Sequence, residues 1–124
     1  MNHLLLIAAG GAIGATARHL VGGFALKQLG SGFPYGTLAV NIVGSFAMGL
    51  LVALLARYGA SGGTRLFLAT GLLGGFTTFS AFSLEVALLW ERGQAGLAAL
   101  YVTLSVAAGI AALFGGLALV RGLD

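Results

Sequence analysis

The stretch GLLGGFTTFSAFSLE, residues 71–85, interrupts an otherwise apolar segment with glycines, hydroxyl side chains and a carboxylate. Glycine and β-branched threonine both weaken a helix. A helix break in a bilayer frees backbone carbonyls and amides, which are tolerated only where they are buried in protein or face water or an ion. The stretch therefore predicts a membrane helix that is broken near Gly75, where freed carbonyls suit a small cation and a new helix N-terminus suits an anion.

The composition of the whole chain supports a membrane protein. Of its 124 residues, 59% are hydrophobic and only 7% are charged, and the mean hydropathy is +1.05. A soluble domain carries roughly 25% charged residues, so a chain this poor in charge is expected to reside in the bilayer. The basic residues are scattered and form no patch for nucleic acid. The chain has no cysteine, which excludes disulfides and thiolate metal sites.

Four hydrophobic stretches are long enough to cross a bilayer as helices. The connections between them are short and leave no room for a soluble domain. The segments lack the alternation of a β-barrel. We therefore predict an all-α membrane protein, with residues 1–124 forming a single four-helix transmembrane domain whose third helix is broken near its middle. The expected spans are residues 4–29, 36–58, 65–90 and 95–120.

Basic residues in the loops set the orientation of membrane helices. Arg57, Arg65 and Arg121 lie on one side of the predicted bundle, and Lys27 and Arg92 lie on the other. Three against two is almost no bias, so the chain is expected to insert in both orientations. Dual topology allows an antiparallel homodimer, whose eight helices can surround a polar path that four helices hardly enclose.

Two pairs of glycines have the G-x-x-x-G spacing that allows close helix packing. They are Gly10 with Gly14 and Gly71 with Gly75. The spacing is compatible with packing inside one chain and with packing between two chains.

Polar residues at membrane depth are costly and tend to mark function. Asn41 lies about five residues into the second span. Its amide either bonds a neighbouring helix or faces a permeating anion. Arg18 and Glu85 are the only charges well inside spans, and both lie toward the Lys27 and Arg92 side. We expect them to be structural charges, paired with each other or with a second copy of the chain.

The spacing after the predicted break places like residues on shared helix faces. Phe79 and Phe82 are three residues apart, and so are Ser80 and Ser83. Because a phenyl ring has a positive edge, two rings presented edge-on can solvate an anion without a fixed positive charge. The alternative is that these rings fill the core or face lipid.

The fourth span carries a further polar pair. Tyr101 and Ser105 are four residues apart and share one face. They extend a hydrogen-bonding track or bond back to the carbonyls of their own helix. No serine has a recognisable base and orienting acid, so an enzyme is not expected.

These features coincide in a family of known membrane proteins. The chain resembles the small fluoride channels of the CrcB/Fluc family over essentially its whole length. The segments that carry the resemblance are GGAIGATAR (residues 10–18), GTLAVNIVGSF (residues 36–46), GLLGGFTTFSAFSLE (residues 71–85) and the pair Tyr101 and Ser105.

The resemblance implies a passive, fluoride-selective channel that exports fluoride across the inner membrane of a bacterium and lowers its toxicity in the cytoplasm. It implies an antiparallel, dual-topology homodimer with two pores. A structural sodium ion is expected at the dimer interface, held by the backbone carbonyls of Gly74 and Thr77 from both subunits. Arg18 matches an arginine of the family's first span.

The resemblance also assigns a pore. Asn41 would be its polar residue, and Phe79 and Phe82 would contact fluoride by their ring edges. Thr37 would line it, and Tyr101 and Ser105 would continue its polar track. Ser80 and Ser83 are expected to line the pore as well, because they share a helix face beside the rings. The next helical position of the track is Gly109, where some relatives are expected to have a hydroxyl, so the last step of the track is left here to a backbone group or a water.

Two other functions compete with the channel. Small multidrug-type exporters are also short, four-helical and dual-topology, but they couple protons to cationic substrates through an embedded carboxylate. The first span here has none, and Glu85 lies toward an interface. The third reading is a packing subunit without transport of its own.

Overall fold

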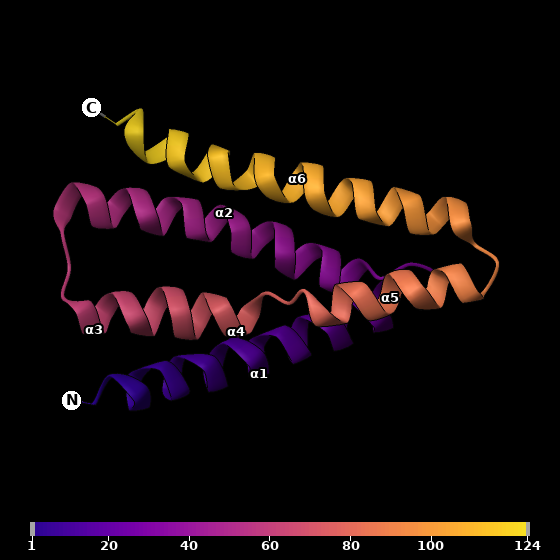
Figure 1. Cartoon of the computed structure of the whole chain (residues 1–124), viewed down its shortest axis with the longest axis horizontal. Helices are drawn as coiled ribbons and strands as arrows, with labels where there is room; N and C mark the ends of the chain where they lie inside the picture. The colour runs from indigo at the N-terminus through magenta and orange to yellow at the C-terminus, as the bar shows by residue number, and fades with distance from the viewer. Residues whose placement is uncertain (1, 124) are drawn as a thin grey trace.

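The structure, a computed structural model, describes residues 2–123, so the terminal residues of the predicted domain 1–124 lie outside it. Helices joined by short turns account for its regular structure (Figure 1). In chain order they are α1 (His3–Leu29), α2 (Tyr35–Tyr58), α3 (Gly62–Arg65), the π-helix η1 (Leu66–Leu73), α4 (Gly74–Phe76), α5 (Ser80–Glu91) and α6 (Ala95–Arg121).

Within residues 2–123, four segments are long and apolar enough to cross a membrane, as the sequence predicted. The first, second and fourth are α1, α2 and α6, and the third is the run from α3 to α5, Gly62–Glu91. The largest difference from the predicted bounds is at the start of the third span, which begins at Gly62 rather than Arg65. The start of α1, the end of α6 and the turn between α2 and α3 lie at one end of the bundle (Figure 1), as four consecutive crossings require.

The third span is broken where the glycine-rich stretch predicted. Helix α4 ends at Phe76, and Thr77 is extended, with φ −89° and ψ 158°. The helix resumes at Ser80 as α5. Before the break, residues 66–73 are wound as a π-helix, a wider turn that the sequence pattern did not reveal.

The G-x-x-x-G pairs pack against each other within one chain. Helix α1 runs along η1 and α4. A Cβ atom added at Gly14 would overlap the carbonyl oxygen of Leu72, and one added at Gly75 would lie 2.7 Å from the carbonyl oxygen of Gly11. The glycines therefore let two backbones touch, which fixes α1 beside the first half of the third span.

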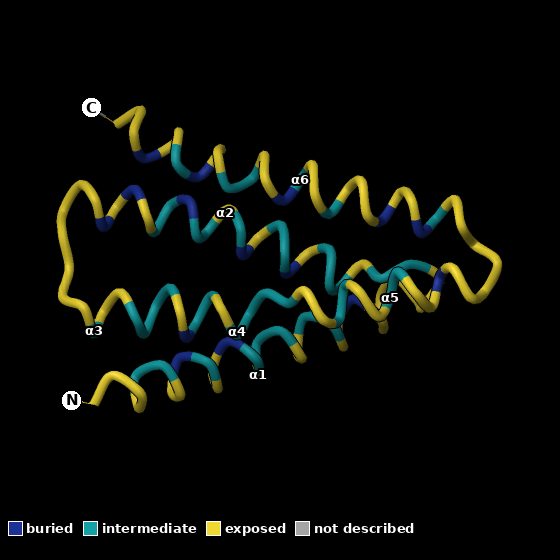
Figure 2. The backbone as a smooth tube through the Cα atoms, in the orientation of Figure 1, coloured by how far each residue is buried: buried dark blue, intermediate teal, exposed yellow. Residues whose placement is uncertain are grey.

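Helices α2 and α6 form the second close pair of the bundle, and they lie side by side in Figure 1. Gly49 and Gly116 make this approach possible, because a side chain at either would overlap a backbone carbonyl of the other helix. Buried positions lie along the facing sides of the helices, and the outer sides are exposed (Figure 2). A small core of Leu89, Ala98 and Tyr101 joins α5 to α6.

Candidate functional site

Asn41 of α2 makes two hydrogen bonds to the backbone of Thr78, which lies in the break of the third span. The backbone amide of Thr78 donates to Asn41 Oδ1 at 2.8 Å, and Asn41 Nδ2 donates to the carbonyl of Thr78 at 3.0 Å. The side-chain amide of asparagine has two N–H groups, so one N–H of Asn41 remains free to donate after the bond to Thr78 is made. The helix–helix bond that the sequence allowed is confirmed, and it leaves a donor for a second partner.

The same bonds release backbone carbonyls. In a continuous helix the amide of Thr78 would donate to Gly74, and that of Ala81 would donate to Thr77. Here the Thr78 amide goes to Asn41, and the Ala81 amide goes to Oγ1 of Thr78 at 3.2 Å. The carbonyls of Gly74 and Thr77 thereby lose their helical partners, and these are the two oxygens that the family resemblance assigns to a sodium ion.

Arg18 of α1 also bonds to the backbone next to the break, on the α4 side. Its Nε donates to the carbonyl of Gly75 at 3.1 Å. Within residues 2–123 of one chain, Arg18 forms no ion pair with Glu85, so the intrachain pair expected from the sequence is not made. The reason is that the break offers Arg18 a free carbonyl nearby. A pair between Arg18 and the Glu85 of a second copy stays a prediction.

A cavity of about 470 Å³ lies beside the break. It brings together residues of α2, the third span and α6 that the sequence had marked separately. Its lining includes Asn41, Gly74, Thr77, Phe79, Phe82 and Ser105. It also includes Ser45, which our sequence analysis missed. The signal was present, because Ser45 follows Asn41 by four residues and so shares its helix face.

Ser80 and Ser83 do not line this cavity. The hydroxyl of Ser83 donates to the carbonyl of Phe79 at 3.0 Å, and that of Ser80 lies 3.3 Å from the hydroxyl of Thr78. Both serines are exposed on the surface of the single chain. Their place in a pore built by two chains stays a prediction.

A series of aromatic rings leads from the surface to the core. Phe79 is 78% exposed, and its ring centroid lies 5.6 Å from that of Phe82. Phe82 in turn lies 5.1 Å from Tyr101, which is fully buried. Phe33 packs edge-on against Tyr101 from the turn before α2, at 5.5 Å. The core therefore fixes the position of Phe82, whereas Phe79 projects from the chain.

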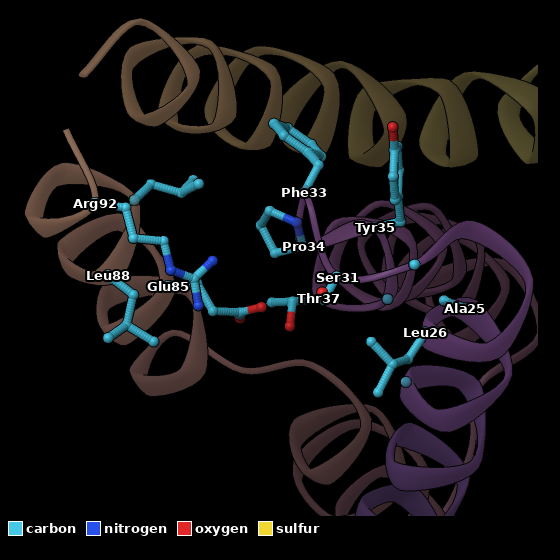
Figure 3. Close-up of a pocket in the computed structure, with 14 residues that line it drawn as sticks. Ala25, Leu26, Ser31, Phe33, Pro34, Tyr35, Thr37, Glu85, Leu88 and Arg92 are labelled. Atoms are coloured by element: carbon cyan, nitrogen blue, oxygen red, sulfur yellow. The ribbon is translucent and has the colours of Figure 1, made fainter. Parts of the chain in front are cut away.

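A second cavity, of about 300 Å³, lies between α5 and the turn that joins α1 to α2. Thr37, Glu85 and Arg92 are among its lining residues, and the side chains of Glu85 and Thr37 point toward each other (Figure 3). Tyr101 lies close to both, without a hydrogen bond of normal geometry to either. Thr37 thus belongs to a cluster around Glu85 rather than to the cavity beside the break.

Between the cluster around Glu85 and the cavity beside the break, three buried polar atoms have no hydrogen-bond partner among the described residues. They are Oε1 of Glu85, the hydroxyl of Tyr101 and the hydroxyl of Ser105. Unpaired buried polar groups are rare and costly. Their position from one cavity to the other is compatible with the polar track predicted for Tyr101 and Ser105, because these two hydroxyls can donate to water or an anion. The carboxylate oxygen of Glu85 only accepts, so water can satisfy it.

Comparison with known proteins identifies the family. Residues 5–117 match the model described as CrcB-like protein, Camphor Resistance (CrcB). The chain is 60% identical over 124 residues to a protein of Chelativorans sp., with 99% of each chain covered. It is 58% identical over 123 residues to a protein of Mesorhizobium japonicum, again with 99% of each covered. Both relatives are named fluoride-specific ion channel FluC, an ion channel rather than an enzyme.

A relative from Agrobacterium fabrum, 57% identical over 124 residues, has the same name and covers the chain to the same extent. With its four spans and these bacterial relatives, the chain is a multi-pass protein of a bacterial inner membrane. The matches extend over nearly its full length and include the broken third span. The chain belongs to the CrcB family.

Proposed function

We propose that this chain forms a passive channel that is selective for fluoride and exports it from the cell. The observation that carries the proposal is the cavity beside the break, which is lined by uncharged hydrogen-bond donors and phenyl rings. One N–H of Asn41 and the hydroxyl of Ser105 are available there. The relatives' name, fluoride-specific ion channel, supports the same function.

The chemistry of fluoride fits such a lining. The ion is small and strongly hydrated, so donors must replace its water shell along the path. The amide of Asn41, hydroxyl groups and the ring edges of Phe79 and Phe82 supply them. Chloride is larger, and a narrow path with fixed donors excludes it by size and geometry. Among the described residues, no positively charged side chain lines the cavity, so the ion is not held too tightly to leave.

Two copies of the chain complete the site in this proposal. The Phe79 ring is 78% exposed in one copy, although it stands next to the cavity. In the 18-residue apolar part of each span, only 6% to 28% is buried within the chain. Wide apolar faces are therefore left for lipid and for a partner. Together with the weak charge bias, this favours an antiparallel, dual-topology homodimer with two pores.

Dual topology gives a direct prediction. A reporter fused to the C-terminus, active on only one side of the membrane, should give signal for about half of the molecules, because three loop charges against two set no orientation. The matched measurement uses a reporter that is active on the opposite side. Strong signal from one reporter and none from the other would contradict the antiparallel dimer.

A structural sodium ion is part of the same proposal. The carbonyls of Gly74 and Thr77 fit it, because both lose their helical donors and hard cations prefer oxygen ligands. With two carbonyls from each subunit, four oxygens would surround the ion. It would supply a fixed positive charge that clips the two breaks together. Asn41 and Arg18 keep the break open for it.

Fluoride efflux from liposomes tests the function. The purified chain, reconstituted in vesicles loaded with potassium fluoride, should release fluoride at an electrode when valinomycin lets potassium follow, without any proton gradient. Chloride-loaded vesicles serve as the selectivity control and should retain their contents. Proton-coupled movement of an organic cation without fluoride flux would indicate the multidrug-type exporter, and no transport at all would indicate a packing subunit.

A further inference from the structure

Hydroxyl groups on the membrane helices differ in whether their own helix uses them. Among the described residues, four donate to the carbonyl four residues earlier, at 2.6 to 3.0 Å, which is the usual bond of serine and threonine in a membrane helix. These are Thr16, Thr77, Ser83 and Thr103. Ser45 and Ser105 differ from them, because within residues 2–123 neither hydroxyl makes a hydrogen bond.

Ser45 and Ser105 face the same space from different helices. Both line the cavity beside the break, Ser45 from α2 and Ser105 from α6. Ser45 is half-buried, so its hydroxyl is neither exposed on the protein surface nor closed off in the core. Asn41, one helical turn before Ser45, lines the cavity as well. Three uncharged donors from two helices therefore converge on one cavity.

Ser45 also fills a gap in the polar face of α6. Tyr101 and Ser105 are followed four residues later by Gly109, which has no side chain. A Cβ atom added at Gly109 would lie 3.8 Å from Oγ of Ser45, and apart from its own helix backbone and chain neighbours no other described atom lies within 4 Å. The hydroxyl of Ser45 thus stands next to the place where a side chain at position 109 would begin.

We propose that Ser45 is a hydrogen-bond donor to fluoride in this cavity and supplies from α2 the hydroxyl that α6 lacks at Gly109. The inference rests on the proposed channel function and adds a residue to it. A small anion that leaves water needs several donors at once. Ser45 serves this need because, unlike Thr16 or Thr103, its hydroxyl is not used by its own helix.

The first test is fluoride efflux from liposomes that contain Ser45→Ala. Efflux should be about tenfold slower than for the wild-type chain, because a hydrogen bond to a charged partner is lost. Thr16→Val is the matched control. It also removes one hydroxyl, but that hydroxyl donates to the carbonyl of Ala12 on the exposed side of α1, so efflux should stay at the wild-type rate.

The second test separates a donor from a packing residue. Gly109→Ser in the Ser45→Ala background returns a hydroxyl to the same part of the cavity, and its Cβ has room. Efflux should recover to within about threefold of wild type, since Ser45→Ala leaves the remaining donors in place. A lost packing contact on α2 would not be restored by this change on α6. Size-exclusion profiles in detergent confirm that all variants are folded to the same extent.

Each outcome bears on the inference. Wild-type efflux from Ser45→Ala overturns it, and so does slow efflux that Gly109→Ser does not restore. A wild-type chain that conducts no fluoride overturns the proposed function, and this inference with it. Slow efflux that the double variant restores supports Ser45 as a donor.

Discussion

Asn41→Asp should stop fluoride efflux, with a decrease of at least about a hundredfold. The change keeps the oxygen that accepts from the Thr78 amide, but it replaces the Nδ2 group that donates to the Thr78 carbonyl at 3.0 Å with a second oxygen. Two acceptors then face each other. The added negative charge also repels an anion in the adjacent cavity, by about 4 kcal/mol at 4 Å and an effective dielectric constant of 20. Efflux from liposomes measures both effects together.

The chain offers a matched control for this substitution. Asn2 caps α1, where its side chain accepts a hydrogen bond from the Leu4 amide, and aspartate caps a helix equally well. Asn2→Asp makes the same chemical change at an exposed site outside the bundle, so its efflux should equal that of the wild type. Undiminished efflux from Asn41→Asp would remove Asn41 from the pore.

Phe82→Ile should slow fluoride efflux by tenfold or more and leave the protein folded. Isoleucine keeps apolar contact with Tyr101, whose ring lies 5.1 Å from that of Phe82, so the core between α5 and α6 stays filled. It has no aromatic edge, so the positive rim that would solvate the anion is lost. The measurement is fluoride efflux, together with the elution profile of the variant in detergent.

Phe24→Ile is the control for the ring, because Phe24 is 66% exposed on α1 and lines neither cavity described above. Its efflux should match the wild type. If Phe82→Ile also conducts at the wild-type rate, the edge-on role of Phe82 is wrong, and Phe82 is then a core residue that supports Tyr101.

The fold was predictable from the sequence because its signals are local. Each span is an apolar run of sufficient length, and the short connections force consecutive crossings. The break was predictable for the same reason. Gly74 and Gly75, followed by Thr77, weaken the helix at that point, and the structure interrupts it at Thr77. The composition of residues 71–85 showed that this stretch is unusual for a membrane helix, while the family resemblance indicated that the ion is fluoride.

The partners of the break were not predictable, because they depend on contacts between distant residues. The sequence left Asn41 with two alternatives, and the structure shows how one side chain makes a helix–helix bond and keeps a second N–H. The sequence also left Arg18 and Glu85 to pair with each other or with a second copy of the chain, and within one chain Arg18 bonds the carbonyl of Gly75 instead of Glu85. Glycine spacing cannot tell packing within a chain from packing between chains, which the contacts of Gly14 and Gly75 now show within one chain.

The partners that satisfy the break have a consequence for how the protein is made. Arg18 and Asn41 precede the break in the chain, and domains are synthesised from the N-terminus. When residues 74–79 emerge from the ribosome, the two side chains that bond their open backbone are already in the first two spans. The third span therefore does not have to wait for α6 before its exposed peptide groups find partners in the bilayer.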